Sequence, residues 1–296
     1  MLGRLLTAMI TPFKPGGDVD YREAVRLAES LVDAGNEGLV LSGTTGESPA
    51  LETKEKLRLF EVVKSALGDR ATIVAGTGGN NTHHSIELTS EASKCGVDAI
   101  LAVVPYYNKP TQDGMLLHFG AIADSTALPI IVYNVPSRTG ANMLPATLRT
   151  LQDRHRNIAG VKDSTGDLAQ MTAILRERRE GFLFYCGDDH LFLPVLALGG
   201  DGLVGVASHL CAPQFREMMR AFESGDVRRA GMIHRELSPL FAALFATTSP
   251  IPVKWAMAQL GWHVGPCRSP LGAMPEELKP RLAGFLEAYR TAPAAV

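Results

Sequence analysis

The sequence predicts an α/β protein, a (β/α)8 barrel (TIM barrel) with a small helical appendage at its C-terminal end. Two observations lead to this prediction. Eight short apolar segments alternate with amphipathic segments, which is the pattern of βαβ units in a parallel sheet. After about Gly225 the apolar segments stop and only helical patterns follow. We therefore expect a barrel over residues 1–224 and a helical region over residues 225–296, and the chain length suits such a barrel.

The eight apolar segments are rich in Val, Ile and Ala with little polar alternation, as expected for parallel strands buried on both faces. They are Leu5–Ile10, Gly38–Ser42, Thr72–Gly76, Ala99–Val104, Ile130–Asn134, Ile158–Lys162, Phe182–Cys186 and Gly202–Ala207. The first runs into Pro12 without a small-residue cleavage site, so we interpret it as a strand rather than a signal peptide. Helical patterns between the strands include Tyr21–Asp33, Thr53–Leu67, Ser85–Lys94 and Leu168–Arg179.

The C-terminal region is predicted to be helical throughout. Its three helical patterns are Asp226–Phe245, Pro252–Leu260 and Pro275–Tyr289, separated by proline- and glycine-containing junctions. The alternative fold is a doubly wound sheet, but no G-x-G-x-x-G motif follows the first strand to support it.

Composition favours small-molecule chemistry. The 29 basic and 31 acidic residues give a formal net charge of −2, and no long run of one sign suggests nucleic acid or an anionic membrane as a partner. No apolar stretch reaches the roughly 18 residues that a transmembrane helix requires. The four cysteines are far apart and form no C-x-x-C pair, which favours reduced thiols in the cytoplasm over disulfides or zinc; they are Cys95, Cys186, Cys211 and Cys267.

Reactive residues are expected at the C-terminal ends of the strands, where barrel active sites form. After the second strand, Gly43 and Gly46 flank Thr44 and Thr45. Such a turn can present backbone N–H groups to a small carboxylate, with a threonine hydroxyl as a further donor. The alternative is a plain turn whose hydroxyls cap a helix.

Two further strand ends carry phenols and a guanidinium. Tyr106 and Tyr107 lie between prolines after the fourth strand, where packing in an interface is the alternative. Tyr133 lies in the fifth strand, and a phenol inside a barrel needs a hydrogen-bonding partner. Arg138, in the following loop, offers a bidentate fork for a carboxylate.

Lys162 is the strongest single signal, because it lies in an otherwise apolar strand. Burial of a lysine favours the neutral amine, which is the nucleophile that Schiff-base chemistry needs. The alternative is an ion pair with the adjacent Asp163.

The sequence contains no recognisable motif for binding a metal, a nucleotide or a phosphate. The eight histidines form neither H-x-H nor H-E-x-x-H, so we expect no metal. No P-loop is present, and the GGDG at 199–202 precedes the last strand, on the wrong side of the barrel for a phosphate. We expect no cofactor.

Taken together, the motifs resemble the dihydrodipicolinate synthase and N-acetylneuraminate lyase superfamily. The resemblance covers nearly the whole chain and rests on GTTGE at 43–47, PYYNKP at 105–110, YNVPSRTG at 133–140, GVKDSTG at 160–166, CGDD at 186–189 and PIPVKWA at 250–256.

The resemblance implies a Schiff-base lyase in which Lys162 condenses with pyruvate and Tyr133 is the general acid/base. Thr44 and Tyr107 would complete a hydroxyl relay, with Tyr107 supplied across a tight dimer interface. It further implies a homo-oligomer, as a tetramer made of two such dimers.

Substrate contacts are implied in the same way. Thr45 matches the residue that holds the pyruvate carboxylate, Val204 a second pyruvate contact, and Gly187 a backbone contact beside the second substrate. Arg138 resembles the arginine with which synthases bind the carboxylate of aspartate semialdehyde, whereas sialic acid lyases and sugar-acid aldolases carry an apolar or small residue there. This favours a synthase that forms 4-hydroxy-tetrahydrodipicolinate for lysine biosynthesis. A sugar-acid aldolase and a non-catalytic barrel that binds keto acids remain the alternatives.

Lysine-inhibited relatives carry a histidine and a carboxylate in their regulatory pocket. Here Lys56 replaces that histidine and His84 replaces the carboxylate, whereas Ser48 and Asn80 are the same as in those relatives. We therefore expect feedback inhibition by lysine to be lost.

Overall fold

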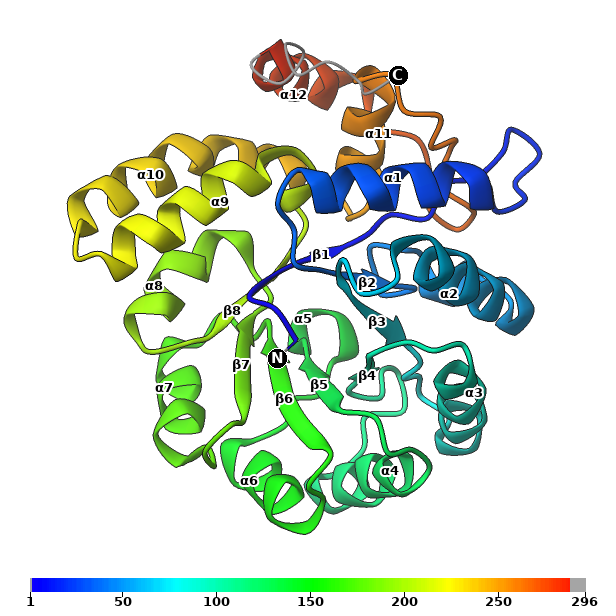
Figure 1. Ribbon diagram of the computed structural model, residues 1–296, viewed down its shortest axis with the longest axis vertical. Helices are drawn as coiled ribbons and strands as arrows, with labels where there is room; N and C mark the ends of the chain where they lie inside the picture. Colours follow the sequence, from blue (N-terminus) through cyan, green and yellow to red (C-terminus); the bar gives the residue numbers. More distant parts are fainter. Residues whose placement is uncertain (1, 288–296) are drawn as a thin grey trace.

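The computed structural model describes residues 2–287, which form a closed barrel of parallel strands surrounded by helices (Figure 1). Each strand pairs with the next, and β8 closes the barrel by pairing with β1. The strands are β1 (Leu5–Ala8), β2 (Gly38–Leu41), β3 (Thr72–Gly76), β4 (Ala99–Val103), β5 (Ile130–Asn134), β6 (Ile158–Asp163), β7 (Leu183–Cys186) and β8 (Gly202–Gly205). The predicted (β/α)8 fold is confirmed.

Helices cover the outside of the barrel and continue beyond it. Around the barrel lie α1 (Tyr21–Asp33), α2 (Thr53–Leu67), α3 (Thr82–Lys94), α4 (Gln112–Asp124), α6 (Pro145–Arg154), α7 (Leu168–Glu177), α8 (Phe192–Ala197) and α9 (Ser208–Glu223). The short α5 (Pro136–Thr139) follows β5 directly and lies inside this ring of helices (Figure 1). Beyond it follow α10 (Val227–Leu244), α11 (Ile251–Gln259) and α12 (Lys279–Leu286). Short 3-10 turns are η1 (Ser48–Ala50), η2 (Asp189–Leu191) and η3 (Glu276–Leu278).

The strands are buried on both faces, as their composition predicts. Alternate residues such as Leu6, Val40 and Ile131 form a cluster inside the barrel. Their neighbours Leu39 and Val132 belong to the larger core between the barrel and its helices. This alternation decides which side chains reach the barrel interior.

The C-terminal helices share that larger core. In Figure 1, α10 lies alongside α9, and the rings of Phe215 and Phe241 stack between them with centroids 5.5 Å apart. The predicted boundary between residues 224 and 225 falls in the turn between these helices and stays a prediction as a division into domains. The predicted helix end at Tyr289 lies outside the described residues.

Four strands, β1, β2, β4 and β8, end earlier than predicted, and for β1 and β8 side chains take over the hydrogen bonding. The Ile10 N–H donates to His209 Nε2 at 3.1 Å, so the chain leaves the sheet after β1. The N–H groups of Val206 and Ala207 donate to the Asp189 carboxylate, at 3.2 and 3.0 Å from Oδ2. These partners lie far away in the sequence, so a local pattern does not reveal them.

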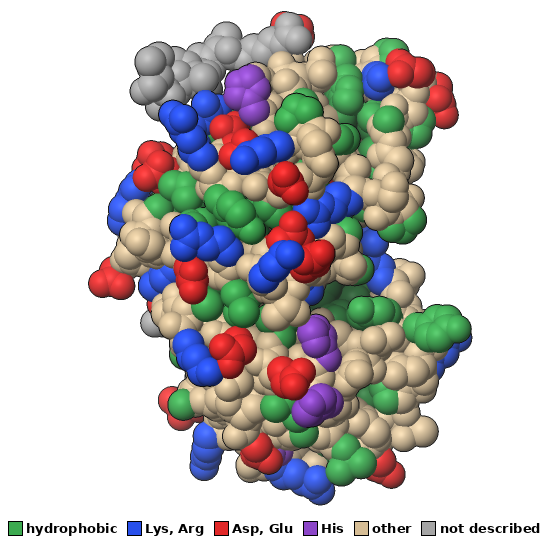
Figure 2. Space-filling view, turned by 90° about the vertical axis from the view of Figure 1, so that its right-hand side faces the viewer, with side chains coloured by type: hydrophobic (Ala, Val, Ile, Leu, Met, Phe, Trp, Pro, Cys, Tyr) green, Lys and Arg blue, Asp and Glu red, His purple; other side chains and the backbone are tan. Residues whose placement is uncertain are grey.

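The surface shows no concentration of one charge on the face seen in Figure 2, where acidic and basic side chains are interspersed. Within residues 2–287, no helix is both long and apolar enough to cross a membrane.

Candidate active site

Lys162 and Tyr133 lie side by side inside the barrel. They are paired in register on the adjacent strands β6 and β5, so both side chains leave the same face of the sheet. Both are buried, and Lys162 Nζ lies 4.2 Å from the centroid of the Tyr133 ring. A buried amine against the face of a phenol is a local arrangement suited to a nucleophile with a proton-transfer partner.

Lys162 and Asp163 form no ion pair in the described part of the chain. Neighbouring strand residues point to opposite faces, and the Asp163 carboxylate instead accepts hydrogen bonds from the backbone N–H and the hydroxyl of Thr165, at 2.9 and 2.6 Å. Burial raises the pKa of Asp163 to about 6, although both Thr165 hydrogen bonds oppose that effect. The amine of Lys162 is thus left available inside the barrel.

Gly187 leaves the space that the Lys162 side chain occupies. A Cβ atom at Gly187 would lie 2.0 Å from Ser164 Oγ and 3.0 Å from Lys162 Cε. A larger residue would clash with Ser164 and crowd the lysine. The same corner holds the buried hydroxyl of Ser164, which has no hydrogen-bonding partner among residues 2–287.

Asp189 is a charged neighbour of Lys162 to which the sequence assigned no role. Its carboxyl group is fully buried, and burial raises its pKa to about 6, whereas the backbone N–H donors of Ala207 and Val206 and the charge of Lys162 act in the opposite direction. The sequence feature that pointed to Asp189 was the CGDD motif at 186–189, which contains it.

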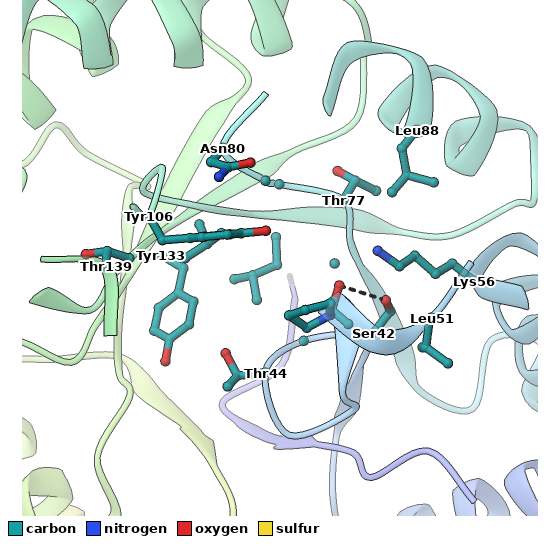
Figure 3. A pocket seen from close by; sticks show the side chains of 18 of the residues that line it. Ser42, Thr44, Leu51, Lys56, Thr77, Asn80, Leu88, Tyr106, Tyr133 and Thr139 are labelled. Carbon is teal, nitrogen blue, oxygen red and sulfur yellow. Dashed lines mark hydrogen bonds between the residues drawn. The ribbon is translucent and has the colours of Figure 1, made fainter. Parts of the chain in front are cut away.

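A cavity of about 410 Å³ opens at the C-terminal ends of the strands (Figure 3). Thr44, Tyr133 and Arg138 line one end, and Figure 3 shows the Tyr133 hydroxyl on the side of the cavity where Thr44 lies. Lys56 points into the cavity from the side opposite Tyr133, and Asn80 lies nearer to Tyr106 in the same view. Within residues 2–287, the Arg138 side chain is exposed and makes no hydrogen bond or ion pair, so its guanidinium is free for a ligand.

A smaller cavity of about 210 Å³ adjoins the first. Thr44 and Arg138 line both cavities, and the smaller one also includes Glu47, Ser249 and Arg268. The C-terminal region therefore forms part of the entrance to the barrel.

The remaining predicted site residues lie elsewhere. Thr45 and Val204 are buried and line neither cavity, and Gly187 lies deeper, beside Lys162. Tyr107 is 88% exposed with a φ of +72°, and its side chain does not join the other hydroxyls of its own chain. Tyr106 lines the larger cavity instead.

A buried charge network anchors the loop that carries Thr44 and Thr45. Lys254 Nζ donates to Glu47 Oε1 at 2.7 Å, with side chains only 2% and 1% exposed, and the Arg268 N–H donates to Glu47 Oε2 at 2.8 Å. Breaking such a buried pair leaves an uncompensated charge, which costs about 3–5 kcal/mol. Glu47 lies in the GTTGE motif and Lys254 in the PIPVKWA motif. Their pairing was not predictable, because 207 positions separate them in the sequence.

Comparison with known proteins agrees with this geometry. The model of the dihydrodipicolinate synthetase family matches residues 1–289. A relative from Moorella thermoacetica named 4-hydroxy-tetrahydrodipicolinate synthase is 53% identical, over 96% of this chain and 97% of the relative. A dihydrodipicolinate synthase from Cyanidioschyzon merolae, solved with lysine bound, superposes with a TM-score of 0.96 at 43% identity, covering 97% of this chain and 98% of that one. A dihydrodipicolinate synthase from Bacillus anthracis superposes with a TM-score of 0.94 at 42% identity, covering 99% of each chain. This chain belongs to the dihydrodipicolinate synthetase family.

Proposed function

We propose that this protein condenses pyruvate with L-aspartate 4-semialdehyde to form 4-hydroxy-tetrahydrodipicolinate, the first committed step of diaminopimelate and lysine biosynthesis. The observation that carries the proposal is the buried, unpaired Lys162 amine against the Tyr133 ring. The four unpaired cysteine thiols support a cytoplasmic location.

The reaction follows from the chemistry of these groups. The Lys162 amine adds to C2 of pyruvate, and water leaves as the imine forms. The imine withdraws electrons, so the methyl group loses a proton and an enamine results. The enamine carbon attacks the aldehyde carbon of the semialdehyde, whose own amine then displaces Lys162 and closes the ring. Each step moves a proton, and Tyr133, Thr44 and a Tyr107 from the neighbouring subunit form the proposed relay.

The substrate carboxylates are assigned to different parts of the site. Thr45 and its turn bind the pyruvate carboxylate, with Val204 against pyruvate and Gly187 beside the second substrate. Arg138 binds the carboxylate of the semialdehyde, which its exposed and unpaired guanidinium at the cavity mouth supports.

A turnover assay tests the activity as a whole. Incubation with pyruvate and aspartate semialdehyde should consume both in equal amounts and form the cyclic product. Cleavage of 2-keto-3-deoxy sugar acids or sialic acid without this condensation would establish the aldolase alternative. Binding of pyruvate with no turnover of either kind would establish a non-catalytic barrel.

Arg138→Ala is expected to raise KM for the semialdehyde while leaving formation of the pyruvate imine nearly intact. Loss of a charged, hydrogen-bonded partner costs about 1.5–3 kcal/mol, so kcat/KM should fall about tenfold to hundredfold. Steady-state kinetics with each substrate varied in turn gives this value. An unchanged kcat/KM for the semialdehyde would remove Arg138 from the site.

We propose a tetramer made of two tight dimers, in which Tyr107 completes the relay of the neighbouring subunit. The side chain is 88% exposed and lines neither cavity of its own chain, so it is accessible to a neighbouring subunit. Hybrid dimers of Lys162→Ala and Tyr107→Phe subunits should then contain one fully intact site and show activity well above either parent. Activity that stays at the level of the parents would place Tyr107 outside the partner's relay.

Millimolar L-lysine is expected to leave the initial rate largely unchanged. The cavity that Lys56 and His84 line contains no Asp or Glu side chain, so the ammonium groups of the inhibitor would meet a like charge and no acid. The measurement is an initial-rate titration with lysine at sub-saturating pyruvate. Substantial inhibition by lysine at sub-millimolar concentration would contradict the prediction.

A further inference from the structure

The Ser164 hydroxyl is a buried polar group without a partner. In the described part of the chain, it is the only buried hydroxyl that makes no hydrogen bond. Buried hydroxyls elsewhere in the barrel are paired, as Thr77 is with Thr89 at 2.7 Å. An unpaired buried hydroxyl costs free energy, and one that lies beside a reactive amine is a candidate for contact with the substrate.

Ser164 directly follows the strand that carries Lys162. Residues two apart in an extended strand leave the same face, so both side chains project into the mouth of the barrel. A Cβ atom at Gly187 would lie 2.0 Å from the Ser164 hydroxyl oxygen and 3.0 Å from Lys162 Cε. The hydroxyl and the carbon that bears the reacting amine therefore meet over the same glycine.

Backbone hydrogen bonds fix the position of this hydroxyl. The Ser164 N–H donates to the carbonyl oxygen of Asn134 at 2.8 Å, and the Gly187 N–H donates to that of Asp163 at 2.8 Å. The side chain of Asn134 is fixed in turn, because its amide donates to the carbonyl oxygen of Met143 and accepts from the Met143 N–H, both at 3.1 Å. A donor held in this way needs no reorganisation when negative charge develops beside it.

Tyr133 and Ser164 approach the amine from different sides. The strand of Lys162, β6, lies between β5, which carries Tyr133, and β7, which Gly187 follows directly. Once the amine attacks pyruvate, the ketone carbon is bonded to Nζ, so its oxygen, methyl and carboxylate groups become the substrate groups nearest to Lys162 Cε. Negative charge develops on the ketone oxygen during this step, and a fixed hydroxyl donor stabilises it.

We propose that the Ser164 hydroxyl donates a hydrogen bond to the C2 oxygen of pyruvate while the Lys162 amine adds to C2. The inference rests on the proposed function, because it requires pyruvate as the carbonyl substrate. Addition forms the N–C2 bond and moves the C2–O π electrons onto the oxygen. Both amine protons then pass to this oxygen through the Tyr133 relay, water leaves, and the imine remains. Ser164 keeps its own proton throughout.

The test uses pyruvate alone and measures how fast the imine forms. The full-length protein is mixed with saturating pyruvate and quenched with borohydride at increasing times, and the reduced adduct is measured by intact-protein mass. Ser164→Ala should slow this rate about threefold to tenfold, the usual loss for one neutral hydrogen bond. The final extent of labelling should not change, because the imine no longer carries the C2 oxygen. Release of pyruvate from the imine should therefore slow by the same factor.

Two further variants separate this role from an effect on packing. Ser164→Thr keeps a hydroxyl on the same Cβ atom and should recover most of the lost rate. The matched control is Ser125→Ala, because Ser125 is also half-buried but donates to the Ile122 carbonyl oxygen at 2.7 Å, at the end of α4 that precedes β5. This variant should form the imine as fast as the unmodified protein, and thermal melts should show that all three variants are folded.

An unchanged rate in folded Ser164→Ala would overturn the inference and leave Lys162 as the nucleophile. A Ser164→Thr variant as slow as Ser164→Ala would overturn it as well, and so would slower imine formation with an unchanged rate of pyruvate release. If the unmodified protein forms no reducible adduct with pyruvate, the proposed function fails, and this inference fails with it.

Discussion

Replacement of Lys162 by arginine is expected to abolish condensation. Arginine keeps the positive charge, but its guanidinium stays protonated and cannot form an imine with pyruvate. Removal of a covalent nucleophile lowers kcat on the order of 10⁴–10⁶-fold. The measurement is kcat with both substrates saturating.

The control for this variant is its folding. Lys162 is buried beside Tyr133, so a thermal melt must show that the protein with Lys162→Arg still unfolds cooperatively. A folded variant that retains more than about a hundredth of the activity would exclude Lys162 as the nucleophile, since such a loss is no larger than that of a general acid or base.

Tyr133→Phe is expected to lower kcat by about 10²–10⁴-fold, which is the usual contribution of a positioned acid or base. The ring that packs against Lys162 remains, so pyruvate binding should change little. Steady-state kinetics separates these effects as a loss in kcat with a nearly constant KM for pyruvate. A rise in KM at constant kcat would instead make the phenol a binding group.

The strand pattern was sufficient to predict the barrel, because residues buried on both faces of a parallel sheet are apolar without alternation. The strand ends were less predictable. His209 and Asp189 terminate β1 and β8 by accepting hydrogen bonds from segments far along the chain, and no local window contains both partners.

The site shows the same division between local and long-range information. Lys162 was identifiable because a lysine in an apolar strand is conspicuous. The burial of Lys56 was not predictable from the helical pattern, because a lysine in an amphipathic helix ordinarily faces solvent. Only the resemblance to lysine-inhibited relatives placed this residue in a pocket, and in the structure it lines the larger cavity. The Lys254–Glu47 pair depends on the docking of the C-terminal helices, which periodicity does not describe.

The central claim is that Lys162 forms the covalent bond to pyruvate, and trapping of the imine tests it most directly. Borohydride added with pyruvate should attach one reduced pyruvyl group per chain, and peptide mapping should place it on Lys162. Three lysines are buried in the described chain, so the map discriminates among real competitors, Lys56 and Lys254 included. A label on Lys56, Lys109 or Lys254, with Lys162 unmodified, would contradict the account.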